Sequence, residues 1–307
     1  MIDLQTLIGF GVAGNFTGHL EQAGEASDFV NIQAAAGAPK GVFPFYVPQA
    51  QDNPTPQAEG CGAQRQSPGS HFLHTFPLSP DTIEHPGDIQ GQAANLQIEP
   101  ELALLCELSY DDAQQVTAIR PTHCAAYNDC STRRPDATKI SQKKNWGPNT
   151  KGLASDQWLL LDSFDEAGIL QHFRVACYLL RDGELHTYGE DSPVAGPDGY
   201  GYMYQQLLDW LIERFNTQQD EGPLEDLAQW LAVAGHPHRA VISIGATRYT
   251  ELGETTFLQP GDDSIVVAYD QRLHNTAGIE AALMKNDLPL REAATCSLLR
   301  QRVIARP

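Results

Sequence analysis

The clearest alternation of hydrophobic and polar positions runs from residue 96 to residue 108. If this stretch is a strand, every second side chain points the same way, and one face is wholly apolar: Leu96, Ile98, Pro100, Leu102, Leu104, Cys106 and Leu108. The opposite face begins with Gln97, Glu99 and Glu101 before it turns apolar. The pattern predicts a strand rooted in the core that carries two carboxylates side by side at one end.

Shorter stretches with strand-like patterns predict further strands. They are expected at residues 7–12, 42–47, 71–76, 158–164, 169–180, 184–188, 240–244 and 264–269. Residues 165–168 are interpreted as a hairpin loop between two of these strands. Asp182-Gly183 is a strong signal for a tight turn that joins two others.

Helical spacing of apolar residues is less common along the chain. The strongest stripe lies in residues 200–215 and consists of Met203, Leu207, Leu208, Leu211, Ile212 and Phe215. Further helices are expected at residues 223–234, 276–285 and 290–302, the last two docked on the body of the protein. A short helix at residues 16–23 would be capped by Asn15 or Thr17. The expected fold class is therefore α+β and mostly β.

Composition describes a globular protein and limits its partners. The chain has 307 residues, of which 41% are hydrophobic and 19% charged, and its formal net charge is −19. This charge argues against binding to nucleic acid or to an anionic membrane. No stretch approaches the ~20 apolar residues of a membrane span, and the amino terminus carries no targeting signal, so a cytoplasmic protein is expected. Residues 34–95 are rich in Pro, Gly, Gln and Ala and predict an extended, loop-rich segment.

The six cysteines show no C-x-x-C spacing, and several lie in apolar runs. They are interpreted as reduced core thiols, with Cys61 as the one that could be exposed. His71 and His74 have a spacing that suits a metal on a helix, but Pro77 and Pro80 argue against a helix there. The cysteines and histidines therefore predict no metal site.

The carboxylates are better candidates for chemistry. Asp129 follows a second strand-like segment and adds a third oxygen donor to Glu99 and Glu101. Oxygen donors on rigid strands suit a hard ion such as Mg²⁺, Mn²⁺ or Ca²⁺. Taken alone, Glu-x-Glu is more often a solvated strand edge. The basic cluster at residues 139–144, next to Arg133, indicates either an anionic substrate or an ordinary solvated loop.

Several motifs in order resemble those of the fumarylacetoacetate hydrolase family. They are Gly14-Asn15-Phe16-x-x-His19, Ile98-Glu99-Pro100-Glu101-Leu102, Asn128-Asp129-Cys130-Ser131-Thr132-Arg133, Trp146 followed by Lys151, Gly245-Ala246-Thr247, and Gln259-Pro260-Gly261-Asp262. The resemblance implies a mixed β-sheet roll with peripheral helices and a smaller amino-terminal subdomain. It divides the chain into an amino-terminal subdomain and lid segment (1–95), a catalytic core (96–275) and a carboxyl-terminal helical tail (276–307). It also implies a homodimer.

The same resemblance implies roles for individual residues. Glu99, Glu101 and Asp129 would hold one divalent cation, expected to be Mg²⁺ before Mn²⁺ or Ca²⁺. His19 and Lys151 would be catalytic, and Arg133 and Thr247 would contact a small anionic keto-acid substrate. In the family a glutamate three residues after the histidine supports it as a base, but Gln22 stands at that position here. Glu21 is the assigned replacement, with Glu25 as the alternative.

The implied activity is metal-dependent chemistry on a small keto acid or β-diketo acid. Hydrolysis of a C–C bond, decarboxylation and tautomerisation all remain open, because the fold and the metal site do not choose among them. The altered histidine segment leaves room for a binding or regulatory protein that keeps the metal but has lost catalysis. A structural Ca²⁺ site on a protein-interaction scaffold is a further alternative.

Overall fold

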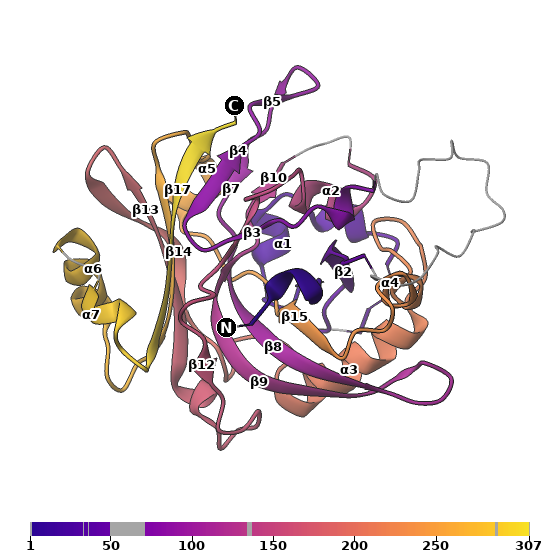
Figure 1. Ribbon diagram of the computed structural model, residues 1–307. Helices are drawn as coiled ribbons and strands as arrows, with labels where there is room; N and C mark the ends of the chain where they lie inside the picture. The colour runs from indigo at the N-terminus through magenta and orange to yellow at the C-terminus, as the bar shows by residue number, and fades with distance from the viewer. Residues whose placement is uncertain are drawn as a thin grey trace.

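The computed structural model describes residues 2–32, 34, 35, 37–49, 71–133, 137–285 and 288–306, without the side chains of residues 288 and 289. Two β-sheets form its centre (Figure 1). The larger sheet has eight strands: β1 (Ile8–Ala13), β2 (Gly41–Tyr46), β3 (Leu78–Ser79), β8 (Pro100–Tyr110), β9 (Val116–Asn128), β11 (Lys151–Leu153), β12 (Leu159–Leu160) and β15 (Arg239–Ser243). Their order is β2-β1-β15-β8-β9-β11-β3, with β12 also paired to β9. Most pairs are antiparallel, but β1 runs parallel to β15 and β11 parallel to β3.

The second sheet has the order β14-β13-β16-β17-β4. Its strands are β4 (Thr82–His85), β13 (Phe173–Arg181), β14 (Glu184–Pro193), β16 (Asp263–Asp270) and β17 (Cys296–Ala305). Two small ribbons pair β7 (Leu96–Gln97) with β10 (Ser131–Thr132) and β5 (Asp88–Ile89) with β6 (Gln92–Ala93). The two large sheets meet where β9 contacts β16 and β17, and the main apolar core includes residues of both.

Helices cover the outer sides of the sheets (Figure 1). On the larger sheet, α3 (Tyr204–Thr217) contacts β2 and β9, and α4 (Leu227–Val233) contacts β2. On the second sheet, α6 (Thr276–Lys285) and α7 (Leu288–Arg291) contact β14 and β17, and Ile279, Leu283 and Leu290 form a separate apolar cluster with that sheet. The short elements are α1 (His19–Gln22), α2 (Ile140–Lys144), α5 (Glu251–Thr255) and the 3₁₀ turns η1 (Leu4–Thr6), η2 (Ala26–Phe29), η4 (Phe72–His74) and η5 (Ile169–His172).

Several expectations are confirmed. The protein is mostly β with a mixed sheet, and the Asp182-Gly183 turn joins β13 to β14. Five cysteines are free and buried, namely Cys106, Cys124, Cys130, Cys177 and Cys296, whereas Cys61 lies outside the described residues. In the described part of the chain, no helix is long and apolar enough to cross a membrane. The two large sheets take strands from all three segments predicted from sequence, and the boundaries between those segments stay predictions.

The helix expected at residues 290–302 is wrong, because most of that stretch is strand β17. It lies between β16 and β4, and side chains on both of its faces are buried. Cys296 and Leu298 pack towards the α6 cluster, and Leu299 and Val303 pack into the main core. A strand that is apolar on both faces loses the alternation that distinguishes a strand from a helix.

Three local expectations are also wrong. Residues 71–76 contain the 3₁₀ turn η4 and not a strand. The strands at residues 158–164 and 169–180 do not form a hairpin, because β12 pairs with β9 while β13 pairs with β14 and β16. The N-cap of α1 is Gly18, at φ 88°, and among the residues described no side chain makes a capping hydrogen bond there. Asn15 instead binds the backbone of Tyr202 and Ile244.

Candidate metal centre

Antiparallel pairing of β8 with β9 brings the three predicted carboxylates together. Glu101 lies opposite Tyr127 in the register, so the start of β8 meets the end of β9. The stretch expected as one strand is interrupted before Pro100, which begins β8 and has no N–H to give to a partner. At the interruption, the Glu99 N–H donates to the Asn128 side chain (3.0 Å), and the Asp129 N–H donates to the Glu99 carbonyl (2.9 Å).

Glu99, Glu101 and Asp129 are all buried, and each offers one oxygen within 4.8 Å of the others. A solvated strand edge is therefore the wrong interpretation of Glu-x-Glu here. Glu99 Oε1 and Asp129 Oδ2 receive no hydrogen bond within the described part of the chain, although cations lie next to both. Carboxylates crowded into a dry site repel one another unless a proton or a cation lies among them.

Two lysines supply positive charge. Lys144, the last residue of α2, places Nζ 2.5 Å from Glu99 Oε2 and 2.8 Å from Asp129 Oδ2. Lys151, the first residue of β11, lies 3.1 Å from Asp129 Oδ1 and donates to the Cys130 carbonyl. Burial acts to lower the pKa of Lys144, but Asp129 and Glu99 together raise it above its ordinary value. Burial outweighs Asp129 at Lys151 and lowers that pKa.

Glu101 differs from its two neighbours. Its carboxylate accepts a hydrogen bond from the Gly245 N–H (2.9 Å) but forms no ion pair within the described residues. Burial, then Asp129 and Glu99, raise the pKa of Glu101 well above its ordinary value. Gly245 adopts φ 113°, and a Cβ there would lie 3.0 Å from the Asn15 Cβ, so the close approach that aims this N–H requires glycine.

Arg133 lies in a second group of charges beside the three carboxylates. Its guanidinium contacts Glu25 Oε1 (2.8 Å), Glu99 Oε1 (2.9 Å) and the Tyr249 hydroxyl (2.9 Å). Burial acts to raise the pKa of Glu99, but Lys144 and Arg133 hold it well below its ordinary value. Arg133 thus binds side chains within the protein. The contact of Arg133 with a substrate carboxylate stays a prediction.

His19 lies at the edge of the same site, at the start of α1. Its Nδ1 is 2.9 Å from the Thr247 carbonyl, and because a carbonyl only accepts, Nδ1 carries the proton and Nε2 keeps a lone pair. Nε2 is 4.0 Å from Glu99 Oε2 and has no hydrogen-bond partner among the described residues; the same is true of the Thr247 hydroxyl. Burial lowers the pKa of His19, which favours the neutral ring.

The two candidate glutamates for His19 lie in different places. Glu21 is exposed, whereas Glu25 is buried and paired with Arg133 and with Lys143 (3.4 Å). Gln22, at the position where the family motif has its acid, binds the Tyr249 backbone and Glu254. The structure brings Glu25, and not Glu21, into the charged cluster, and the catalytic role of Glu21 stays a prediction.

A small cavity of about 20 Å³ lies among these groups. Its lining includes His19, Glu25, Glu99, Glu101, Asp129, Lys144 and Ala246. A cavity of this size has room for one water or one ion, and it has no room for a keto acid. The all-oxygen donor set fits a hard divalent ion, and so does Glu101, which has no basic partner among the residues described.

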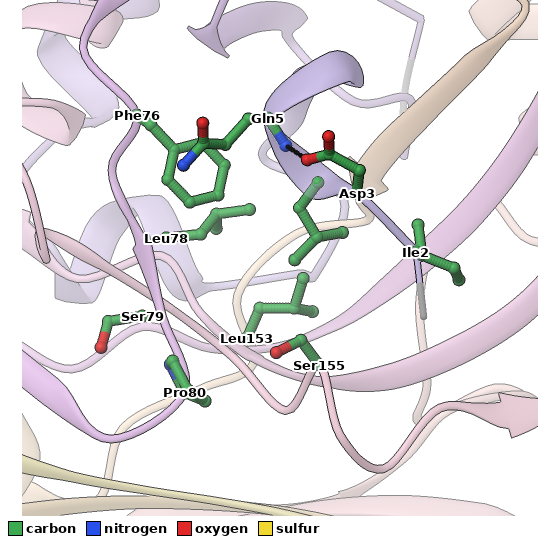
Figure 2. A pocket seen from close by; sticks show the side chains of 10 residues that line it. Ile2, Asp3, Gln5, Phe76, Leu78, Ser79, Pro80, Leu153 and Ser155 are labelled. Atoms are coloured by element: carbon green, nitrogen blue, oxygen red, sulfur yellow. Dashed lines mark hydrogen bonds between the residues drawn. The ribbon is translucent and has the colours of Figure 1, made fainter.

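A larger hollow lies elsewhere and shares no lining residue with this cavity. It measures about 390 Å³ and is open on one side of the molecule. Figure 2 shows its walls, which come from the amino-terminal turn (Ile2, Asp3, Gln5), from residues 76–80, and from Leu153 and Ser155. Its described lining residues include one carboxylate, Asp3, and no cluster of acids or bases, so the small buried cavity is the better candidate for chemistry.

A buried carboxylate–lysine cluster between the ends of paired strands defines a candidate metal centre in a mostly β protein. The chain belongs to a family described as a family of unknown function (DUF5718), whose model matches residues 25–303. A comparison with curated proteins by sequence finds no match.

Solved structures with a similar chain path are distant in sequence. Cg1458 with inhibitor is 14% identical with a TM-score of 0.49, covering 97% of this chain and 77% of that one. The fumarylacetoacetate hydrolase of psychrophilic Exiguobacterium antarcticum is 14% identical, with a TM-score of 0.47. The match covers 99% of this chain and 76% of the hydrolase chain. A 2-keto-3-deoxy-D-arabinonate dehydratase complexed with magnesium and 2,5-dioxopentanoate is 10% identical, with a TM-score of 0.40. The match covers 97% of this chain and 73% of the dehydratase chain. One of these solved structures is a fumarylacetoacetate hydrolase, the family that the sequence motifs resemble. The reactions named for these proteins are not assigned to this chain.

Lys144 is a member of the site that the sequence motifs did not indicate. The solvated-loop interpretation of residues 139–144 is wrong for Lys143 and Lys144, which are both buried. A signal was present in the spacing, because Ile140, Lys143 and Lys144 are three and four residues apart and share one helix face. When Ile140 enters the core, the two lysines enter with it.

Proposed function

We propose that the protein is a divalent-metal-dependent enzyme that acts on a small keto acid or β-diketo acid. The observation that carries this proposal is the group of three buried carboxylates at Glu99, Glu101 and Asp129, within 4.8 Å of one another and bordered by His19 and Lys151. Mg²⁺ is the expected ion, with Mn²⁺ and Ca²⁺ as alternatives. The homodimer and the cytoplasmic location stay predictions.

The chain's own residues would divide the work as follows. Glu99, Glu101 and Asp129 would hold the ion, which would polarise a substrate carbonyl and stabilise enolate charge. Lys151 is fixed by Asp129 and the Cys130 carbonyl and would add positive charge beside the same oxygens. His19, with the lone pair of Nε2 facing the site, would move a proton. C–C hydrolysis, decarboxylation and tautomerisation all use this arrangement.

One observation favours a second candidate function, a metal-containing binding or regulatory protein without catalysis. The cavity of about 20 Å³ admits an ion but no substrate, and Gln22 replaces the acid that would support the base. Such a protein would bind the metal with the same three carboxylates. It would turn over none of the oxo acids.

Turnover of a panel of oxo acids, including acylpyruvates and oxaloacetate, separates the two candidates. The reaction is followed by NMR with Mg²⁺ or Mn²⁺ present and again after chelation. We expect metal-dependent turnover of at least one compound, abolished in Glu101→Gln. Metal binding with no turnover of any compound would favour the binding protein, and absence of metal binding would overturn both candidates.

A further inference from the structure

The ammonium group of Lys144 lies against two of the three site carboxylates. Lys144 Nζ lies 2.5 Å from Glu99 Oε2 and 2.8 Å from Asp129 Oδ2, two members of the carboxylate group. Its side chain is 3% exposed, so the ammonium group is enclosed with the carboxylates. Carboxylate oxygens bind Mg²⁺ at about 2.1 Å and Ca²⁺ at about 2.3–2.6 Å, so an ion shared by these residues needs the space beside the same oxygens.

We propose that Lys144 is a built-in competitor for the divalent cation, whose ammonium group holds the metal-free site together and must leave when the metal enters. This inference rests on the proposed metal site. The cavity of about 20 Å³ is lined by Lys144 itself, so an ion that entered it would lie directly against the ammonium group. Two cations in contact inside a dry site would also repel each other strongly.

The balance of buried charge supports the same inference. Four buried acidic side chains, Glu25, Glu99, Glu101 and Asp129, are matched by four basic side chains that are buried or nearly so, Arg133, Lys143, Lys144 and Lys151. Ion pairs link most of them, and Asp28 joins Lys143 at the exposed rim. The buried acidic and basic side chains of this cluster are therefore equal in number. An entering ion adds two charges, and withdrawal of Lys144 relieves part of the excess.

The position of Lys144 in the chain makes its withdrawal feasible. It is the last residue of α2, a five-residue helix, and its ammonium group already lies 5.5 Å from the centre of the Phe43 ring, a contact that does not depend on the carboxylates. Lys151 cannot take the same part, because it lies within strand β11, is fully buried and also donates to the Cys130 carbonyl. Metal affinity would thus be coupled to the position of the end of α2.

The test is a calorimetric titration of Mn²⁺ into the wild type, Lys144→Gln and Lys143→Gln. We expect Lys144→Gln to bind Mn²⁺ at least tenfold more tightly than the wild type and to have a lower Tm without metal, because Glu99 and Asp129 each lose one counter-ion and keep Arg133 and Lys151. Lys143→Gln is the matched control, since it removes the same charge one residue away, and within the described part of the chain Lys143 forms its ion pairs with Glu25 and Asp28. Its affinity should stay within about threefold of the wild type.

Two further measurements do not depend on the folding of Lys144→Gln. Lys144→Arg keeps the charge and the competition, so its Mn²⁺ affinity should not exceed that of the wild type. In the wild type, the ¹H–¹⁵N signal of the buried Lys144 ammonium group should disappear or shift when Mg²⁺ is added. Equal Mn²⁺ affinity of the wild type and Lys144→Gln, or an unchanged Lys144 signal at saturating Mg²⁺, would overturn the inference while the metal site stands. If the wild type and Lys144→Gln both fail to bind metal, the proposed function falls and the inference falls with it.

Discussion

Among the three site carboxylates, Glu101 has the strongest need for a cation. Glu99 and Asp129 have lysine partners, whereas the Glu101 carboxylate accepts a hydrogen bond from the Gly245 N–H. Burial and the two acidic neighbours raise the pKa of Glu101. A carboxylate in this position is either protonated or bound to a cation. Glu101 is therefore the residue whose replacement separates metal binding from folding.

We expect Glu101→Gln to lower Mg²⁺ or Mn²⁺ affinity at least tenfold while the metal-free Tm stays equal to or above that of the wild type. The amide keeps an oxygen for the Gly245 N–H and removes a buried charge that repels Asp129. Calorimetric titration and a thermal melt measure the two effects. Glu107→Gln, at an exposed position on the same strand, is the control. Unchanged affinity in Glu101→Gln would contradict the metal site.

A second buried acid, Glu225, predicts a pH dependence of stability. Burial raises the pKa of Glu225 to about 7, against the opposing effects of the Ser141 hydroxyl and Lys139. The folded protein then holds the proton over a range in which the unfolded chain has lost it. Stability is full below the ordinary carboxyl pKa and falls as pH rises through about 7.

From about pH 5 to about pH 8, this group should cost the wild type about 2–3 kcal/mol of unfolding free energy, at about 1.4 kcal/mol per pKa unit. Glu225→Gln should remove that slope, and urea unfolding at the two pH values measures it. Glu221→Gln, an exposed neighbour, should behave like the wild type. Parallel pH profiles for the wild type and Glu225→Gln would show that Glu225 titrates normally.

At the scale of elements, the next prediction concerns helix α3. Its apolar stripe was predicted from the sequence to be part of the core. Leu207, Leu208, Leu211 and Phe215 are all buried, and the helix contacts β2 and β9. Leu211→Ala should lower the unfolding free energy by about 2–5 kcal/mol because it leaves a cavity in a packed site. Denaturant unfolding measures the change, and the exposed Gln206→Ala should have little effect. A Leu211→Ala variant as stable as its parent would mean that α3 is not packed.

Sequence periodicity located α3 and β8 because each has one buried and one less buried face over part of its length. It misread β17, whose Ser297 and Gln301 are as buried as its leucines, since the side chains of a strand covered on both faces carry no period. The three carboxylates were recognised from local motifs, yet the role of Lys144 depends on where the short helix α2 docks. Docking is a tertiary property, so the sequence showed the lysine but not its partners.

At the scale of the whole molecule, the site is closed. His19 comes from α1, the carboxylates from the ends of β8 and β9, and Thr247 from the segment after β15, and together they leave about 20 Å³. A keto acid can enter only if one wall moves. The α1 segment is the candidate, because it is four residues long and follows two glycines with positive φ, Gly14 and Gly18.

The last prediction concerns His19, which is the first residue of α1 and would move with it. With a turned-over keto acid in hand, His19→Ala should lose most of kcat, because Nε2 is the basic nitrogen facing the site. Glu21→Gln should be silent if the exposed side chain stays exposed when α1 moves, whereas Glu25→Gln should lower both kcat and Tm, because it also breaks the pairs with Arg133 and Lys143. Steady-state kinetics and thermal melts together distinguish these effects.

Full kcat in His19→Ala would show that the base lies elsewhere. A dead His19→Ala beside two fully active glutamate variants would favour decarboxylation or tautomerisation over hydrolysis, since the metal would then carry most of the enolate stabilisation.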